Sequence, residues 1–157
     1  MVSTPIDDYA FVDTNILIYA HSVGDNDPRA RLSRQILASL WKTDRGVVST
    51  QVLQEFYAVA TRKLRPPLPK KQARDIVASY CTWCSVNTDP LLIISASRLE
   101  EDHSLAFWDA LIIEAALRAG ATKLLSEDLQ HGRRFGDLVV ENPFRDASRR
   151  GSGEDDQ

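Results

Sequence analysis

The first strand-like segment of the chain reads Tyr9-Ala10-Phe11-Val12-Asp13-Thr14-Asn15. Residues 9–12 form a short apolar run of the kind found in buried strands. The run stops at Asp13, so a carboxylate stands where the predicted strand ends. In open α/β sheets, ligand sites form in the crevice at the carboxyl ends of the strands. Asp13 is therefore the first candidate site residue.

Downstream of this segment, helix-like and strand-like patterns alternate. After a polar break, Asp27 and Pro28 offer a helix start, and an apolar helical face follows through Leu40. Ser49 or Thr50 is expected to cap the next helix, which must end before the prolines of residues 64–69. Further helices are expected at about 70–81, 90–102 and 106–119, and further strands at 47–48, 85–87, 123–125 and 138–140.

Strands separated by helices imply a parallel sheet that is covered by helices on both faces. The predicted fold class is therefore α/β. In detail, we expect a three-layer α/β/α sandwich with a central, mostly parallel sheet of about five strands.

Length and composition indicate one soluble globular domain. The chain has 157 residues, of which 43% are hydrophobic and 26% charged, with a net charge of -3. Its apolar runs fall short of the ~20 residues that a membrane helix needs, so we expect no membrane contact. Residues 1–8 hold two acids and no basic residue, unlike a signal peptide. We predict a domain over residues 1–147 and a disordered tail over 148–157, where apolar side chains are lacking after Ala147.

Four acids fall where such a sheet would bring them to one edge. Asp13 ends the first strand, and Asp128 lies just past the strand at 123–125. Glu55 lies in the first turns of the helix after the second strand, and Asp109 lies in the first turn of the last helix. Acids near helix starts also occur for stability alone, because the helix dipole favours them there. Four of them converging on one sheet edge favour a shared site.

The chemistry of these acids points to a metal ion. Asp109 lies in the almost wholly apolar segment 105–113, and a bare buried charge is costly. Clustered carboxylates repel one another unless a cation lies among them. Oxygen ligands without paired His or Cys select a hard cation, Mg²⁺ or Mn²⁺. His21, His103 and His131 lack metal-ligand spacing, although His21 and His131 follow the first and last acids closely.

At these acids the chain resembles the PIN-domain family. The motifs are Phe11-Val12-Asp13-Thr14-Asn15, the lone acid in Leu53-Gln54-Glu55-Phe56, Phe107-Trp108-Asp109-Ala110-Leu111-Ile112, and Leu125-Ser126-Glu127-Asp128, followed by Val140-Glu141-Asn142-Pro143-Phe144. The resemblance spans about residues 9–144 and depends on the order and spacing of the motifs. The length of the chain is similar to that of VapC-type toxins, the ribonuclease half of a toxin–antitoxin pair.

This resemblance implies a function and a set of partners. It implies a PIN-like nuclease domain, a Mg²⁺- or Mn²⁺-dependent endoribonuclease that hydrolyses RNA phosphodiester bonds with a metal-activated water. It also implies a homodimer, a small cognate antitoxin that plugs the site, and a cytoplasmic location. A PIN nuclease for RNA processing outside a toxin system, or a catalytically idle PIN-like binding scaffold, is the alternative.

Each of these residues has an expected role. Asp13 and Asp109 are the first-choice metal ligands, because they should face each other across the sheet edge. Asp128 would bind a second ion or position the water, and Glu55 would hold metal waters or help deprotonate one. Thr14 and Asn15 either orient Asp13 or shape the turn after the strand, and Ser126 either holds a metal-bound water or serves as a turn hydroxyl.

Two positions depart from the family pattern. Many relatives carry Ser where Ala106 stands, so the helix that contains Asp109 lacks that cap. In the last motif Glu127 adjoins Asp128, and either acid is a possible metal ligand. The register of the motif favours Asp128.

RNA must be drawn to a negatively charged pocket, so basic side chains should rim it. The candidate RNA-binding residues are Arg62, Lys63, Arg65, Lys70 and Lys71 around the proline-rich turn, and Arg133 and Arg134 near the last strand. Either group is equally compatible with a solvated loop. Phosphate contacts from these residues would supply affinity with little sequence information.

A response-regulator receiver also gathers acids at a sheet edge. Such a protein would show adjacent acids after the first strand, where this chain has Asp13-Thr14-Asn15.

Cys81 and Cys84 match the redox Cys-x-x-Cys spacing, yet they end an apolar stretch instead of opening a helix after a strand. We expect them to be buried at a helix end, with redox or metal chemistry as the alternative.

Overall fold

Strand β1 (Tyr9–Val12) lies inside a six-stranded sheet with the order β3-β2-β1-β4-β6-β5. The computed structural model describes residues 8–24 and 26–145. The other strands are β2 (Gly46–Ser49), β3 (Cys84–Val86), β4 (Ala121–Leu125), β5 (Arg134–Phe135) and β6 (Leu138–Glu141). The strands pair in parallel except for the antiparallel hairpin of β5 and β6. The mostly parallel sheet is as expected.

The chain changes direction across the sheet at β1. From β1 it moves outward to β2 and β3, and it then returns to the other side of β1 to form β4 and β6. Such a topological switch point leaves a crevice at the carboxyl ends of the two strands that flank it. Val12 pairs with Leu125 in these two strands. The residues that follow them, Asp13 and Ser126, therefore leave the sheet side by side.

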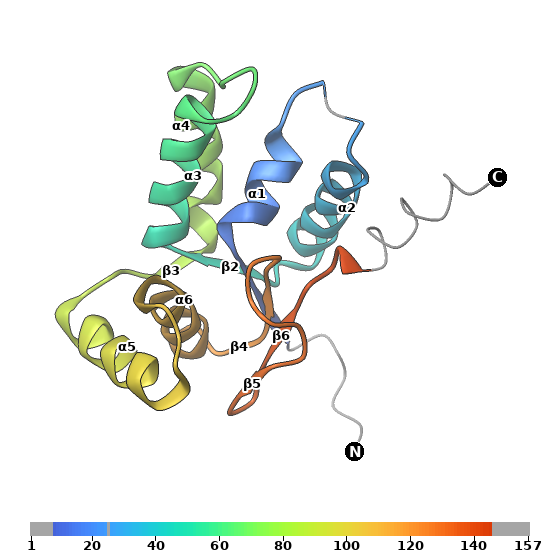
Figure 1. The fold of residues 1–157 in the computed structure, drawn as a ribbon. Coiled ribbons are helices and arrows are strands. Elements are labelled where there is room, and N and C mark those ends of the chain that lie inside the picture. The colour runs from blue at the N-terminus through green and yellow to red at the C-terminus, as the bar shows by residue number, and fades with distance from the viewer. Residues whose placement is uncertain (1–7, 25, 146–157) are drawn as a thin grey trace.

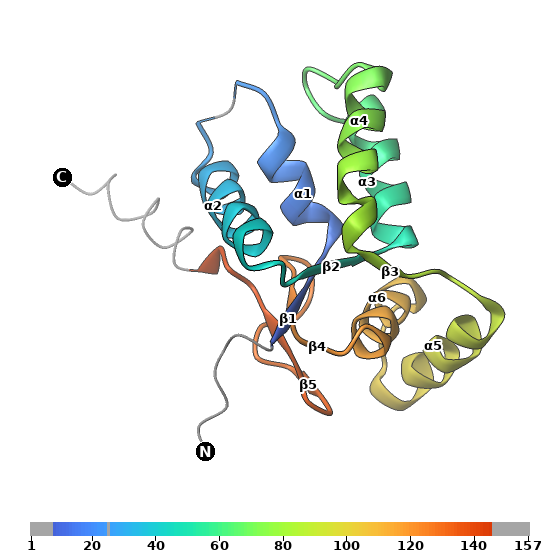
Figure 2. The same ribbon diagram turned by 180° about the vertical axis from the view of Figure 1, so that it is seen from behind.

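Helices cover both faces of this sheet. They are α1 (Thr14–His21), α2 (Pro28–Thr43), α3 (Thr50–Arg62), α4 (Lys70–Tyr80), α5 (Pro90–His103) and α6 (Phe107–Arg118). Figures 1 and 2 show α1 and α2 on one side of the sheet and α5 and α6 on the other, with α3 and α4 paired beside α1. This arrangement is the expected three-layer α/β/α sandwich.

Side-chain caps set the starts of several helices. Asp13 accepts from the N–H of Thr14 at the start of α1, and Asp27 accepts from the N–H of Arg29 at the start of α2. Ser49 does the same for α3, where its hydroxyl accepts from the N–H of Val52. The caps predicted at Asp27 and Ser49 are confirmed. Ala106 stands at the N-cap of α6 and forms no side-chain cap, as its sequence predicts.

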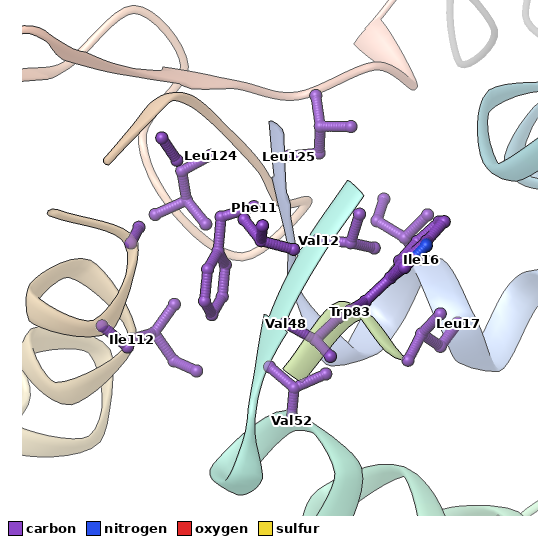
Figure 3. Packing of buried hydrophobic residues seen from close by; sticks show 14 of the residues in the cluster. Phe11, Val12, Ile16, Leu17, Val48, Val52, Trp83, Ile112, Leu124 and Leu125 are labelled. Carbon is purple, nitrogen blue, oxygen red and sulfur yellow. The ribbon is translucent and has the colours of Figure 1, made fainter. Parts of the chain in front are cut away.

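The core lies on both faces of β1. Phe11 and Val12 are fully buried, and successive side chains of a strand point to opposite faces. Figure 3 shows Phe11 pointing towards Ile112 of α6, and Val12 pointing to the side where Ile16 of α1 lies. Burying one such side chain stabilises the fold by about 1.5–3 kcal/mol. The apolar run that predicts β1 is therefore also what holds the two helical layers to the sheet.

Three local features differ from the sequence-based prediction. The prediction omits α1, which lies between the first strand and the polar break, because its apolar residues follow directly on the strand and show no separate periodicity. It also omits the two-residue strand β5. Cys81 and Cys84 were expected to be buried, which is wrong for Cys81, an exposed residue, while Cys84 is half-buried.

The reason for the exposed Cys81 is a tight turn. A single turn of 3-10 helix, η2 (Cys81–Trp83), turns Trp83 inward instead, and the Trp83 side chain is buried. A Cβ atom on Gly46 would lie 2.6 Å from the Trp83 ring, so only glycine fits at this position. Trp83, and not Cys81, is therefore the residue of this turn that packs into the core.

In the described ranges, no helix has the length and apolar character needed to cross a membrane. The predicted tail over 148–157 lies outside the described residues, as does the end of the predicted domain at residue 147.

Candidate active site

Asp13 lies at the switch point, at the carboxyl end of β1. Its backbone N–H continues the strand pairing by donating to Leu125 O at 3.0 Å. Its Oδ1 accepts from the N–H of Thr14 at 2.8 Å, and its Oδ2 accepts from the hydroxyl of Ser126 at 2.8 Å. The side chain is fixed by these bonds, and only 7% of the residue is exposed.

Burial makes Asp13 an unusual carboxyl group. Desolvation raises the pKa of Asp13, and the negative charges of Glu55 and Asp128 add to this effect, whereas the hydrogen bonds from Ser126 and Thr14 lower the pKa. Together these influences bring the pKa to about 6. Desolvation and like charges both disfavour the ionised form. Asp13 therefore carries its charge at neutral pH against the influence of its surroundings.

Glu55, in the second turn of α3, is held from two sides. Its Oε2 accepts from the hydroxyl of Thr14 at 2.7 Å, and its Oε1 accepts from Gln51 Nε2 at 2.9 Å. The amide of Gln51 also reaches the backbone carbonyl of Trp108 at 3.3 Å. Glu55 is thus connected both to the start of α1 and to the start of α6.

Asp109 lies in the first turn of α6 and is half-buried. Its pKa is raised by desolvation and, to a smaller extent, by the charges of Asp128 and Glu55. Asp109 and Asp128 line the same pocket, so the structure brings these two acids of separate elements together. A metal site shared by all four acids stays a prediction.

The last motif places its two acids in different surroundings. Asp128 Oδ2 accepts from Asn15 Nδ2 at 3.1 Å, and the backbone N–H of Asp128 donates to Ser126 Oγ at 3.2 Å. Glu127 instead forms an ion pair with Arg29 at 2.9 Å. Asp128 therefore lies with the other acids, whereas the charge of Glu127 is balanced elsewhere.

The supporting residues have specific partners. The hydroxyl of Thr14 binds Glu55, while Asn15 binds Asp128 and accepts from the backbone N–H of Glu127 at 3.3 Å. Ser126 connects Asp13 to Asp128 and is completely buried. Thr14 and Ser126 thus contact Asp13, and Asn15 fixes the loop that carries Asp128.

The four acids fit a hard divalent cation held by few ligands. Over residues 8–24 and 26–145, no three His, Cys, Asp or Glu side chains form a ready-made metal cage. Mg²⁺ keeps several waters and is usually held by one or two carboxylates, so it needs no such cage. In the same ranges, no Lys or Arg forms an ion pair with any of the four acids. Their mutual repulsion is therefore left for a cation to balance.

Beside two of these acids the surface is hollowed into a pocket of about 200 Å³. Asp109 and Asp128 form one part of its wall, and Gln130 and Arg133 contribute further polar groups. Its remaining lining includes apolar side chains such as Leu105 and Ile113. Two larger hollows of the described chain, one beside Ile36 and Lys123 and one beside Leu53 and Tyr57, have neither of these acids in their linings.

The predicted basic residues divide into two groups. Arg62, Lys63, Arg65, Lys70 and Lys71 are exposed around the turn between α3 and α4, and Lys71 pairs with Asp75. Glu55 lies seven residues before Arg62, roughly 10 Å along the helix axis. Figure 1 shows this turn at the end of α3 and α4 that points away from the sheet. Only Arg133 borders the pocket that contains Asp109 and Asp128, and its neighbour Arg134 is exposed on β5.

The sequence matches the PIN domain over residues 10–134, a range that contains all four acids. The chain belongs to the PIN domain family. This match confirms the resemblance seen in the four motifs. The chain has no match among curated proteins.

Solved structures of the same fold include several from toxin–antitoxin systems. A toxin–antitoxin complex from Klebsiella pneumoniae aligns with a TM-score of 0.62 and 19% identity, over 85% of this PIN domain chain and 97% of its own. The Mycobacterium tuberculosis toxin VapC20, described as cleaving the Sarcin-Ricin loop, aligns with a TM-score of 0.57 and 21% identity, over 76% and 91% of the two chains. DNA-bound VapBC from Salmonella typhimurium aligns with a TM-score of 0.58 and 17% identity, over 87% of this chain and 98% of its own.

Two residues near the acids of this PIN domain are not predicted by the sequence. Gln51 is buried and joins Glu55 to the start of α6. The one signal in the sequence is its position four residues before Glu55, on the same helix face. Arg29 pairs with both Asp27 and Glu127, and nothing in the sequence connects it to the last motif.

Proposed function

We propose that this PIN domain is a Mg²⁺- or Mn²⁺-dependent endoribonuclease and the toxin of a type II toxin–antitoxin pair. One observation carries the proposal. Asp13, Glu55, Asp109 and Asp128 come from four separate elements to one switch point, and in the described chain none of them has a basic partner. Such an arrangement is unfavourable without a cation.

The bound metal would polarise the phosphate and lower the pKa of a water, which makes that water a nucleophile at neutral pH. Asp13 and Asp109 are the proposed ligands. Ser126 and the Thr14 N–H fix the rotamer of Asp13, so that its carboxylate is oriented before substrate arrives. Preorganised groups of this kind do not have to reorient during the reaction.

Glu55 and Asp128 are proposed to act beside these ligands. Thr14 and Gln51 hold both carboxylate oxygens of Glu55, which would position it to accept a hydrogen bond or a proton from a water. Asp128, held by Asn15 at the rim of the pocket, would bind a second cation or orient the water. Its exposure makes it accessible to solvent and to substrate.

The biological setting rests on the structural neighbours. Structures with the same fold are toxins and toxin–antitoxin complexes, and their lengths are almost fully covered. We therefore propose a small antitoxin as the partner, RNA as the substrate, a homodimer as the assembly, and the cytoplasm as the place of action.

The decisive experiment measures RNA cleavage by the purified protein in excess EDTA and after return of Mg²⁺ or Mn²⁺. We expect cleavage only with the metal, and a loss of at least roughly 10²-fold for Asp109→Asn. Asp75→Asn, which changes an exposed acid on α4, is the matched control and should cut normally. Undiminished cleavage in EDTA would contradict the mechanism. Metal binding without cleavage of any RNA would favour the idle scaffold.

A further inference from the structure

The pocket beside Asp109 and Asp128 has walls of contrasting character. The two acids lie in its lining with the start of α6 and the loop after β4, and Arg133 contributes the only cationic side chain to the lining. Leu105, Ile113 and Phe135 add apolar surface. A volume of about 200 Å³ is smaller than the ~300–1,000 Å³ of pockets for drug-sized ligands. It can hold part of a polymer chain whose remainder lies outside the pocket.

Arg133 is held in place from several directions. Its backbone carbonyl accepts from the N–H of Val140 at 2.9 Å, which fixes the turn that presents it. Its Nη2 donates to the carbonyl of His103 at 2.8 Å, and its guanidinium carbon lies 5.1 Å from the centroid of the Phe135 ring. These contacts order the side chain in advance, which reduces the entropy lost when it binds a partner.

The charge of Arg133 is not used by a protein carboxylate. Among the described residues no Asp or Glu pairs with it, although Asp109 and Asp128 line the same pocket. The bond to His103 occupies one of the five N–H donors of the guanidinium group. The rest can receive an anion, and a planar guanidinium matches the oxygens of a phosphate in a bidentate manner.

We propose that this pocket is a nucleotide subsite, and that Arg133 binds the backbone phosphate next to the scissile phosphate. The inference rests on the proposed ribonuclease function and deepens it. The ligand is one nucleotide unit of an RNA strand. Its phosphate lies against Arg133, and its ribose or base lies against the apolar surface of Leu105 and Ile113. Arg133 is thus a substrate-positioning residue, whereas the exposed Arg134 is outside the subsite.

A structural explanation for Arg133 also exists and makes a different prediction. The carbonyl of His103 belongs to the last residue of α5, and basic side chains near a helix C-terminus often bind its free carbonyls. If that were its whole role, Arg133 would affect the stability of the fold and leave RNA affinity unchanged.

Arg133→Gln and Arg134→Gln form a matched pair, because each removes one positive charge at neighbouring positions. The affinity for a fluorescent single-stranded RNA is measured in EDTA, where cleavage is absent, at several salt concentrations. We expect Arg133→Gln to weaken binding about 10-fold or more, since a charged hydrogen-bonded contact is lost. The slope of log K against log salt should fall by about 0.7, as for one lost phosphate contact. Arg134→Gln should weaken binding less than about twofold.

Arg133→Lys keeps the proposal testable if Arg133→Gln lowers the melting temperature. Lysine retains the charge and can still donate to His103, so it should restore stability, but it lacks the bidentate fork and should leave RNA affinity reduced. Equal weakening by the two Gln variants, or recovery of both stability and affinity in Arg133→Lys, would overturn the subsite. A wild-type protein that neither binds nor cuts RNA refutes the proposed function itself. Metal-dependent cleavage together with unchanged binding by Arg133→Gln refutes the subsite alone.

Discussion

Ser126 donates a 2.8 Å hydrogen bond to Oδ2 of Asp13, although 113 positions separate the two residues. They meet because Val12 and Leu125 pair in the adjacent parallel strands β1 and β4, and each of the two residues directly follows one of them. A shift of one residue in this register would turn the side chains to the opposite face. The candidate site is therefore a direct product of how the sheet is paired.

Asp13→Asn tests whether this carboxylate is unfavourable in the metal-free protein. In EDTA, the pKa of Asp13 rises from its usual 3.8 to about 6 on folding, so the folded state holds the proton more tightly than the unfolded state. The wild type should therefore lose stability as pH rises from about 4 through 6, by on the order of 3 kcal/mol. Asparagine does not ionise and remains a good N-cap.

The measurement is urea unfolding of the wild type and Asp13→Asn at pH 4 and pH 7. From pH 4 to pH 7, the free energy of unfolding of the variant should rise relative to that of the wild type. Mg²⁺ at pH 7 should restore stability to the wild type, because the cation favours the ionised carboxylate. A stability difference that does not change with pH would show that Asp13 is not strained by its charge.

Asp109→Asn separates a metal ligand from a helix-start anion. The change keeps the shape and removes one of the mutually repelling charges, so the metal-free protein should be equally or more stable. Cleavage should fall by roughly 10²-fold or more. A purely helix-stabilising Asp109 would instead cost about 0.3–1 kcal/mol when replaced, with cleavage unaffected. Thermal melts with and without Mg²⁺, alongside an RNA cleavage assay, distinguish the two roles.

The two neighbouring acids of the last motif should behave differently. Asp128→Asn removes a charge that acts on Asp13 and Asp109, and it should cut RNA at least 10-fold more slowly. Glu127→Gln removes the partly exposed ion pair with Arg29. It should cost less than about 1 kcal/mol of stability and leave cleavage within roughly threefold of normal. Rate measurements on both variants at saturating Mg²⁺ provide the comparison. A larger fall in rate for Glu127→Gln would reverse the assignment.

Gln51→Leu tests a positioning role that the sequence did not reveal. The substitution leaves Glu55 Oε1 and the Trp108 carbonyl without their shared donor. We expect kcat to fall several-fold with little change in KM, and the concentration of Mg²⁺ needed for half-maximal cleavage to rise. Gln54→Leu, at an exposed position on the same helix, is the control. Equal rates for the two variants would show that Gln51 only supports the packing of α6.

Much of the fold is predictable from the sequence for a simple physical reason. Strands buried on both faces appear as apolar runs, as residues 9–12 do, and the helices between them begin at caps such as Asp27 and Ser49. The acids are recognisable in the sequence because they interrupt these patterns where a strand ends or a helix begins. Each of these signals is local and can be recognised within a few residues.

The rest depends on contacts between distant segments. Asn15 binds Asp128 and Gln51 binds the Trp108 carbonyl, and neither pairing leaves a pattern in the sequence. The cysteines are a case in which a local pattern gives a wrong prediction. Their apolar surroundings predict burial, but a single 3-10 turn buries Trp83 and leaves Cys81 at the surface.

Mn²⁺ provides the most direct measurement of the central proposal, because its anomalous scattering locates the ion in a crystal soaked at neutral pH. We predict a peak between Asp13 and Asp109, within ligand distance of both carboxylates, and its loss in Asp109→Asn crystals soaked in the same way. A second peak beside Asp128 would agree with a two-ion site. A wild-type crystal with no peak among the four acids, from protein that still cuts RNA in excess EDTA, would contradict the account.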